Sequence, residues 1–416
     1  MKARRTWLLL LLVLPLSAHA DPLLKQGDFV AICGDSITEQ KQYSVFIEDY
    51  LLMCRPDLKT RAMQFGWGGE VSWGFLGRMD NDALRYKPTI ATTCYGMNDG
   101  GYGPLTDERA KKYRESMTDV VKKFKESGAR VVVGSPGCVD SFTFRKNTDQ
   151  AAVYNKTLGQ LRDIAREVAS EQGVAFADVY QPMIDTMEKA KAKYGKEYPV
   201  AGNDGVHPGA NGHLVMAYAF LKALGCDGDI GTITVDLSAN KATGSAGHDV
   251  KGVHGGMITI ESSRYPFCFT GDPKSPDATR GIIEFFPFND DLNRFKLIVT
   301  GGNADRYKVT WDDESKEFSA SDLSNGINLA AEFLDNPFSE QFQAVNDAVR
   351  AQQNFETPMI KSMIHDIPAN ASRIPDDRQL LEDMARSLVR VDAALSSAAA
   401  AKVTPITHTI RIEPAR

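Results

Sequence analysis

The sequence lacks the motifs and the charge of several large protein classes. After its N-terminal segment, no apolar run is long enough to cross a bilayer of about 30 Å. Lysine and arginine number 48 against 54 aspartates and glutamates, so no basic excess indicates nucleic-acid binding. No CxxC or Cys/His spacing suggests zinc, and the GxSxG, HExxH, Walker and dinucleotide-binding patterns are missing. We therefore expect no metal, no cofactor, no nucleic-acid partner and no stable membrane span.

The first twenty residues have the three parts of a signal peptide. Positive charges at residues 2–5 precede an unbroken apolar run from Trp7 to Leu16, which is too short to span a bilayer. Ala18-His19-Ala20 fits a small-residue cleavage site directly before Asp21. We therefore predict that residues 1–20 are removed and that the mature protein is secreted or periplasmic. An uncleaved membrane anchor is the less favoured alternative.

Six cysteines follow the predicted cleavage site, and their number leaves the disulfide pattern open. An oxidising compartment permits disulfides, but six cysteines can pair in many ways. Cys33, Cys94 and Cys138 lie in or just after apolar runs that are predicted as strands. Buried free thiols explain those three as well as disulfides do.

The first half of the chain alternates short apolar runs with helical patterns. Five runs are predicted as buried strands: Asp28–Cys33, Ala62–Phe65, Thr89–Cys94, Arg130–Gly134 and Val174–Val179. Apolar residues at helical spacing from Tyr113 to Phe124 predict a helix with Thr106 as its N-cap and Gly128 just past its end. The same spacing from Tyr154 to Val168 predicts a second helix, which Gly173 ends. This alternation predicts an α/β fold with a parallel sheet covered on both faces.

The pattern changes after Cys226, where strands with one buried face replace the alternation. The strands predicted here are Ile233–Leu237, Met257–Ile260, Ile282–Phe286, Phe295–Val299 and Tyr307–Trp311. Gly, Asn and Asp clusters separate them, which indicates a small antiparallel β-unit. Helical spacing returns around Phe342–Val349 and over Asp376–Ala401. We divide the chain into the signal peptide 1–20, an α/β domain 21–230, a β-rich accessory region 231–335 and a helical C-terminal region 336–416.

Two polar segments follow strands where open α/β sheets place their sites. Gly34-Asp35-Ser36 comes directly after the first strand, and the carboxyl end of a parallel strand is the ligand-binding edge of such a sheet. Gly96-Met97-Asn98 follows the third strand, and an asparagine amide is able to donate to a developing oxyanion. Each segment also has an ordinary structural explanation. Ser36 would be a helix-capping serine, and Asn98 would belong to an Asn-Asp-Gly turn.

A third segment, Asp204-Gly205-Val206-His207-Pro208, precedes an apolar helix predicted from Leu214 to Leu224. Acid and base lie three residues apart, so one loop would supply both: His207 takes the proton of Ser36, and Asp204 holds the imidazole in the required tautomer. The ordinary explanation is a helix start capped by Asp204. His213 falls on the predicted helix, where we expect a structural role. The remaining histidines of the mature chain have no acidic motif of this kind beside them: His248, His254, His365 and His408.

The order and placement of these segments resemble the SGNH, or GDSL-type, serine hydrolases. The resemblance covers about residues 25–225 and rests on four motifs: Gly34-Asp35-Ser36, Gly66-Trp67-Gly68-Gly69, Gly96-Met97-Asn98-Asp99 and Asp204-Gly205-Val206-His207-Pro208. It implies a three-layer α/β/α sandwich with a five-stranded parallel sheet and a C-terminal β-rich and helical extension. Tyr307 to Leu329 is similar to extensions of some secreted bacterial members, which implies an accessory β-unit without activity of its own.

The resemblance also implies a role for each site residue. Ser36 is the nucleophile, His207 the base and Asp204 its orienting acid, while the amides of Ser36 and Gly69 and the side chain of Asn98 form the oxyanion hole. One position departs from the family pattern, because the second motif usually begins with asparagine and this chain has Gln64 or its neighbour there. That departure concerns the support of the loop more than the chemistry.

These roles imply a secreted serine esterase that forms an acyl-enzyme on Ser36. The site segments contain hardly any aliphatic residues, which favours O-acetyl groups on carbohydrate over long acyl chains. Four aromatic residues near the motifs either stack on sugar rings or pack helix against sheet: Trp67, Trp73, Tyr95 and Tyr102. The alternatives are a secreted lipase or thioesterase of the same fold, and a non-catalytic carbohydrate-binding protein on a retired hydrolase fold.

Overall fold

The computed structural model describes residues 23–415, so the predicted signal peptide lies outside the described residues. A parallel five-stranded sheet forms the centre of the N-terminal half, in the order β2-β1-β3-β4-β5. Its strands are β1 (Phe29–Gly34), β2 (Arg61–Gln64), β3 (Ile90–Cys94), β4 (Arg130–Gly134) and β5 (Ala175–Ala177). All five lie within or beside the apolar runs that predicted them.

Helices cover both faces of this sheet. They are α1 (Ser36–Glu39), α2 (Tyr43–Asp49), α3 (Ser72–Asp82), α4 (Asp107–Glu126), α5 (Thr148–Gln172), α6 (Tyr180–Tyr194) and α7 (Ala210–Ala223). Side chains of a strand alternate between its faces, so Ala31 and Cys33 join the core that contains α3 and α4, whereas Val30 and Ile32 join the core that contains α2 and α7. The predicted three-layer α/β/α fold is confirmed.

The predicted helix ends are also present. The Thr106 side chain accepts a hydrogen bond from the amide of Arg109 at 3.3 Å and so caps α4. Gly173 ends α5 in the left-handed region with a φ of 62°, which costs glycine little because it has no Cβ. Local sequence therefore sets where these two long helices stop.

The β-rich region consists of two sheets that face each other. One has the order β13-β10-β6-β7 and the other the order β12-β11-β14-β9-β8. Their strands are β6 (Asp229–Asp236), β7 (Lys241–Gly244), β8 (His248–His254), β9 (Met257–Ser262), β10 (Arg294–Thr300), β11 (Arg306–Trp311), β12 (Glu314–Ser319), β13 (Ile327–Asn328) and β14 (Ile406–Pro414). Phe295 of the first sheet stacks on His248 of the second, with ring centroids 4.6 Å apart.

Three features of this region differ from the prediction. β6 and β10 pair in parallel, so the unit is not purely antiparallel. The run Ile282–Phe286 is not a strand: Ile283–Phe285 forms a 3₁₀ turn before Pro287, and its apolar side chains reach the core without joining a sheet. The last strand, β14, was not predicted, although it pairs with both β9 and β11. The C-terminal 336–416 segment is therefore helical only up to residue 400.

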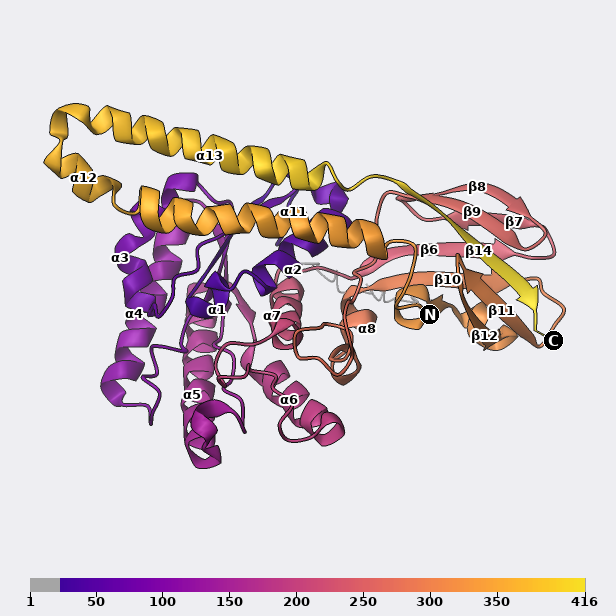
Figure 1. Ribbon diagram of the computed structural model, residues 1–416, viewed down its shortest axis with the longest axis horizontal. Coiled ribbons are helices and arrows are strands. Elements are labelled where there is room, and N and C mark those ends of the chain that lie inside the picture. Colours follow the sequence, from indigo (N-terminus) through magenta and orange to yellow (C-terminus); the bar gives the residue numbers. More distant parts are fainter. Residues whose placement is uncertain (1–22, 416) are drawn as a thin grey trace, which may run out of the picture.

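The helices of the C-terminal region return to the α/β domain. In Figure 1, α11 (Ser339–Pro358) and α13 (Arg378–Ala400) run side by side across that domain, before β14 re-enters the β-rich region. A π-helical segment (Met359–Ile364) and α12 (Ile367–Arg373) connect them. Three short helices, α8 (Phe288–Leu292), α9 (Ala320–Asn325) and α10 (Leu329–Glu332), complete the fold.

α11 packs directly against the free edge of the parallel sheet. The amide of Gln64 in β2 donates to the Glu356 carboxylate at 2.8 Å, and the Gln352 side chain donates to the carbonyl of Ala62 at 3.2 Å. Backbone groups of an edge strand otherwise lack partners. Side chains of α11 thus satisfy the edge that a sixth strand would occupy.

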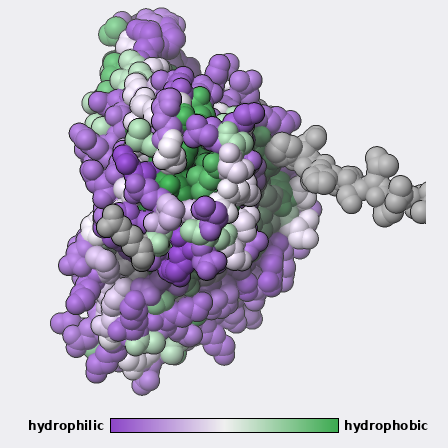
Figure 2. Space-filling model, turned by 90° about the vertical axis from the view of Figure 1, so that its right-hand side faces the viewer, coloured by the Kyte–Doolittle hydropathy of each residue, from purple (hydrophilic) through white to green (hydrophobic). Residues whose placement is uncertain are grey.

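The face of the protein that Figure 2 shows is mostly polar, and the cysteines are buried. Viewed from the side of the β-rich region, polar side chains cover most of the surface around a smaller hydrophobic area (Figure 2). All six cysteines are buried free thiols. Among the helices within residues 23–415, none is both long enough and apolar enough to cross a membrane.

Candidate active site

Ser36, His207 and Asp204 come together at the carboxyl end of the sheet. Ser36 is the first residue of α1, directly after β1, and its Oγ lies 2.8 Å from Nε2 of His207. Nδ1 of His207 lies 2.6 Å from a carboxylate oxygen of Asp204. A carboxylate only accepts, so Nδ1 carries the proton and Nε2 is free to accept from the serine hydroxyl. The three side chains predicted from the sequence therefore form one hydrogen-bonded chain.

The loop that carries Asp204 and His207 holds the two side chains in position by its own hydrogen bonds. The other Asp204 carboxylate oxygen accepts from the amides of Val206 and His207, each at 2.9 Å. Partial burial alone would raise the pKa of Asp204, but the hydrogen bonds from the His207 amide and ring and from the Val206 amide outweigh it and lower that pKa. Asp204 is therefore held as the carboxylate that the imidazole needs as a partner.

Three groups were predicted as donors to the oxyanion: the amides of Ser36 and Gly69 and the side chain of Asn98. Neither the amide of Ser36 nor that of Gly69 has an acceptor among residues 23–415. The Asn98 side chain donates one proton to the carbonyl of Glu70 at 3.0 Å, and its oxygen accepts from Tyr102 at 2.9 Å. The second amide proton of Asn98 stays available. All three therefore have a donor free for an oxyanion, and the oxyanion hole at these residues stays a prediction.

Two buried side chains support these donors and were not singled out from the sequence. The Asp99 carboxylate accepts from the amide and hydroxyl of Ser72 at 2.9 and 2.6 Å, and from the amide of Gly96 at 3.0 Å. It thereby joins the Asn98 turn to the start of α3. Arg78 holds Glu70 with a 2.6 Å ion pair and also donates to the carbonyl of Phe65 at 2.8 Å. Asp99 lay within a quoted motif, but nothing in the local sequence indicated Arg78.

The aromatic residues near the motifs mostly pack against protein. Tyr95 is buried and cannot face the crevice. Lys112 lies over the Trp73 ring at 4.0 Å, and Tyr102 stacks on Tyr154 with centroids 5.0 Å apart. Trp67 is half-buried among charged side chains. Of the two roles predicted for these rings, packing is the one that their contacts favour.

A polar cleft of about 310 Å³ opens beside His207. Its lining combines the end of α1 with the His207 loop and a loop of the β-rich region, and includes Gln40, Gln42, Asn203 and Asp277. The two loops are joined where the amide of Asn211 donates to the carbonyl of Pro276 at 3.1 Å. The β-rich region thus supplies part of the wall next to the candidate base.

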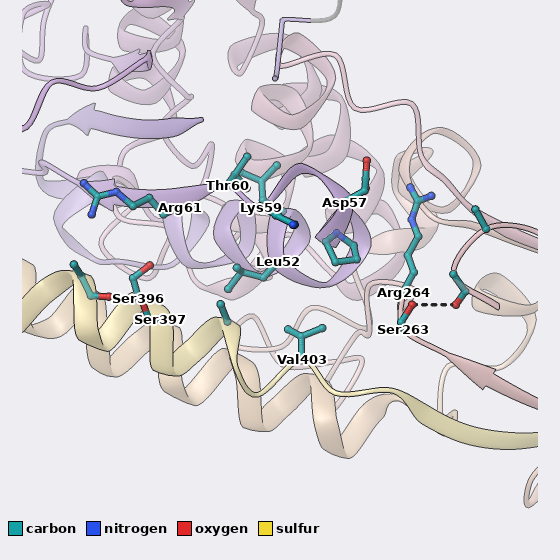
Figure 3. Close-up of a pocket in the computed structure, with 16 residues that line it drawn as sticks. Leu52, Asp57, Lys59, Thr60, Arg61, Ser263, Arg264, Ser396, Ser397 and Val403 are labelled. Carbon is teal, nitrogen blue, oxygen red and sulfur yellow. Dashed lines mark hydrogen bonds between the residues drawn. The ribbon is translucent and has the colours of Figure 1, made fainter. Parts of the chain in front are cut away.

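A larger cavity of about 870 Å³ lies away from this site. In Figure 3, Ser396 and Ser397 of α13 face the segment Lys59–Arg61, with Val403 and Arg264 further along. None of the residues that line it belongs to the Ser36, Asn98 or His207 segments. Size therefore does not identify the catalytic cleft in this protein; hydrogen-bond geometry does.

Comparison with known proteins places this geometry in a family. Residues 32–215 match the GDSL-like lipase/acylhydrolase family over a span that contains Ser36, Gly69, Asn98 and His207. This part of the chain belongs to that family. As a GDSL-like acylhydrolase, the protein is a serine carboxylic ester hydrolase.

Two relatives illustrate how far the likeness extends. Acetylxylan esterase from Geobacillus stearothermophilus is 22% identical over 220 residues, which cover 49% of this chain and 94% of the relative. A gut microbial diltiazem-metabolizing enzyme of known structure superimposes with a TM-score of 0.73 at 24% identity, covering 94% of this chain and 98% of that chain. The second likeness shows that the β-rich and C-terminal regions of this GDSL-like hydrolase belong to a shared fold.

Proposed function

We propose that this protein is an exported esterase that removes O-acetyl groups from carbohydrate through an acyl-enzyme on Ser36. The observation that carries the catalytic part is the continuous chain Ser36–His207–Asp204, at 2.8 and 2.6 Å, together with a Ser36 amide that has no acceptor within residues 23–415. Serine is a weak nucleophile unless a neighbouring base takes its proton. Here the base lies at hydrogen-bond distance and is itself oriented by an acid.

The reaction follows from this geometry in two halves. Ser36 Oγ attacks the ester carbonyl while Nε2 of His207 takes the hydroxyl proton, and the oxyanion accepts from the amides of Ser36 and Gly69 and from Asn98. His207 then gives the proton to the departing alcohol, which leaves the acyl group on Ser36. Water attacks the acyl-enzyme with His207 again as base, and the carboxylic acid leaves as Ser36 is restored.

The cleft beside His207 supports carbohydrate as the alcohol. The departing oxygen must lie close to His207, because that residue protonates it. The residues that line the cleft there include Gln40, Gln42, Asn203 and Asp277, whose polar groups suit hydroxyls. Its apolar lining residues are prolines, and no Leu, Ile, Val or Phe is among them. The loop 138–148 carries two phenylalanines that are able to shape an apolar groove, of which Phe144 is buried and Phe142 is half-buried. The acetylxylan esterase named above, at 22% identity, agrees with this proposal.

Substrate profiling tests the proposal. We expect kcat/KM for p-nitrophenyl esters to fall from acetate through butyrate to octanoate, and acetate to be released from acetylated xylan. Long chains gain about 0.8 kcal/mol per buried methylene only where a groove buries them. Ser36→Ala is the control and should release no acetate. A rate that climbs with chain length, with no acetate from any glycan, would assign the protein to the lipases instead.

Export is the second part of the proposal and rests on the sequence of residues 1–20. Expression in a bacterial host with the full N-terminus should give a mature chain that begins at Asp21. Edman sequencing of protein from the periplasm or medium measures this. A chain that stays in the cytoplasm with Met1 intact would remove the export part and leave the catalytic part untouched.

A further inference from the structure

The loop Gly66–Gly69, called the glycine loop below, reaches the C-terminal region through Glu39. The amide of Gly68 donates to one carboxylate oxygen of Glu39, which lies in the same short helix as Ser36. The other carboxylate oxygen accepts from Nζ of Lys361 at 2.7 Å. Lys361 belongs to the π-helical segment Met359–Ile364 that follows α11. One hydrogen bond therefore joins the glycine loop to Glu39, and a second joins Glu39 to Lys361.

A second, separate connection joins the start of the glycine loop to α11. The amide of Gly66 donates to the side-chain oxygen of Gln64 at 2.9 Å. The side-chain nitrogen of Gln64 donates to the hydroxyl of Thr357 at 2.9 Å. The departure from the family pattern lies at Gln64 or its neighbour, and the structure gives Gln64 a partner in the C-terminal region.

Two backbone hydrogen bonds also hold the glycine loop: the amide of Trp67 donates to the carbonyl of Gly34 at 3.1 Å, and the amide of Glu70 donates to the carbonyl of Trp67 at 3.1 Å, which closes a turn over Gly68 and Gly69. Gly68 and Gly69 are exposed, and Gly69, with a φ of 71°, has no neighbouring atom within 4 Å of the position of a Cβ. At the other end the packing is tight, because a Cβ on Gly66 would lie 2.2 Å from the amide nitrogen of Glu39. The hydrogen bonds of the Gly66 and Gly68 amides therefore act together with this turn to set the direction of the Gly69 amide.

The side chain of Trp67 adds a third contact with the same segment. Nζ of Lys361 lies 4.8 Å from the centre of the Trp67 ring, and the imidazole of His365 has its centroid 4.8 Å from it. His365 is in turn fixed by Asp82, whose carboxylate is 2.6 Å from Nδ1. No residue near His365 in sequence indicated a role for it, but in the structure its ring lies against Trp67 of the glycine loop.

We propose that Lys361 and Thr357 are positioning residues that hold the glycine loop in the geometry the oxyanion requires. The inference rests on the proposed function, in which the Gly69 amide stabilises the oxyanion. Lys361 fixes the direction of the Glu39 carboxylate, Glu39 holds the Gly68 amide, and the adjoining Gly69 amide is aimed as a result. The active site of this protein is then completed by a segment far outside the matched family region 32–215.

The test is a set of kinetic measurements on Lys361 variants with p-nitrophenyl acetate. Misplacing an oxyanion donor costs less than deleting it, so Lys361→Met should lower kcat about 10-fold and leave KM little changed. Lys361→Arg should restore most of kcat, because a guanidinium also reaches Glu39. Adding Glu39→Gln to Lys361→Met should cause little further loss, because both changes break one connection.

Glu382→Gln is the matched control. It breaks the 2.6 Å Arg85–Glu382 ion pair, which also joins the C-terminal helices to the α/β domain but lies apart from the glycine loop. Its kcat should equal that of the wild type. Equal losses in Glu382→Gln and Lys361→Met, or a Lys361→Met variant with wild-type kcat, would overturn the proposal.

Thr357→Val supplies an independent variant should Lys361→Met not fold. It removes the hydroxyl that Gln64 contacts and should also lower kcat with KM unchanged, whereas wild-type kcat in this folded variant would overturn the role of Thr357. The proposed function is tested separately by the wild type. If the wild type hydrolyses no ester, that function fails; if it does and the variants match it, only the positioning role fails.

Discussion

The polar atoms of the Asn98 side chain are almost fully engaged by the protein. Its oxygen accepts from Tyr102 and one amide proton goes to the carbonyl of Glu70, which leaves one proton directed by those two bonds. An amide held in this way does not need to reorient as charge develops on the substrate. Asn98 therefore contributes more to the transition state than to the binding of the ester.

Replacing Asn98 tests that assignment. Asn98→Ala should lower kcat by about 10²–10³, because a preorganised donor is lost where charge develops. Tyr102→Phe is the matched control; it keeps the donor and removes only one of the bonds that orient it, so its loss should be smaller. Steady-state kinetics with p-nitrophenyl acetate measures both. A raised KM with kcat intact in Asn98→Ala would assign the residue to substrate binding instead.

At the scale of elements, a cluster of buried carboxyls joins α2, α11 and α13. Glu48 of α2 accepts from Gln353 of α11 at 2.8 Å, Glu356 of α11 accepts from Gln352 at 3.0 Å, and Asp392 lies on α13. Burial raises the pKa of each of these three carboxyls, against the lowering effect of their hydrogen bonds. The folded protein therefore binds protons here that the unfolded chain has released.

This cluster makes stability depend on pH. Unfolded carboxyls ionise near pH ~4, and the folded ones at higher pH, so the free energy of unfolding falls as pH rises above about 4. Asp392→Asn removes one of the buried charges and should raise that free energy by about 1 kcal/mol at pH 8, with no gain near pH 4.

Urea unfolding at both pH values measures the difference. Asp383→Asn, an exposed change on the same helix, is the control and should alter neither value. An Asp392→Asn variant that is less stable than the wild type at pH 8 would show that the carboxylate is favourable where it lies.

The elements that the sequence predicted are those set by residues close together in the chain. The five parallel strands and the ends of α4 and α5 depend on neighbouring residues, and their patterns predicted them. The run Ile282–Phe286 has a strand-like composition, but Ile283–Phe285 forms a 3₁₀ turn beside the core instead. β14 has the alternation of a half-buried strand, with buried Ile410 and Ile412 alternating with the less buried Thr409 and Arg411, but the prediction extended the helical region over it.

The residues of the site also differ in whether the sequence alone indicates a role for them. Ser36, Asn98 and His207 each lie in a short motif beside a predicted element, so the sequence predicted a role for each. Lys361 and Thr357 meet Glu39 and Gln64 only because α11 crosses the sheet edge, and pairing over such a separation leaves no local pattern.

For the whole molecule, the contacts of α11 bear on whether the C-terminal half is accessory. α11 satisfies the backbone of β2 and packs against α2, so a chain that ends near residue 230 would expose a sheet edge and a buried polar cluster. If the region after residue 230 were only accessory, as its division from the α/β domain implies, such a chain would keep some ester activity. The contacts now predict the opposite.

A truncation experiment separates the two expectations. Residues 21–230 alone should give little soluble protein and no cooperative melting by circular dichroism, because unpaired edges promote aggregation. The full mature chain is the control. A soluble 21–230 chain with wild-type kcat would show that the C-terminal half is accessory, and it would also contradict the positioning role of Lys361.

The central claim is that Ser36 is an activated nucleophile, and fluorophosphonate labelling tests it most directly. Such reagents react with a serine hydroxyl only where a base takes its proton. Peptide mass spectrometry of the labelled wild type should place the phosphonate on Ser36, and neither Ser36→Ala nor His207→Gln should be labelled. Absence of label from the folded wild type, or equal labelling of Ser36→Ala, would contradict the account.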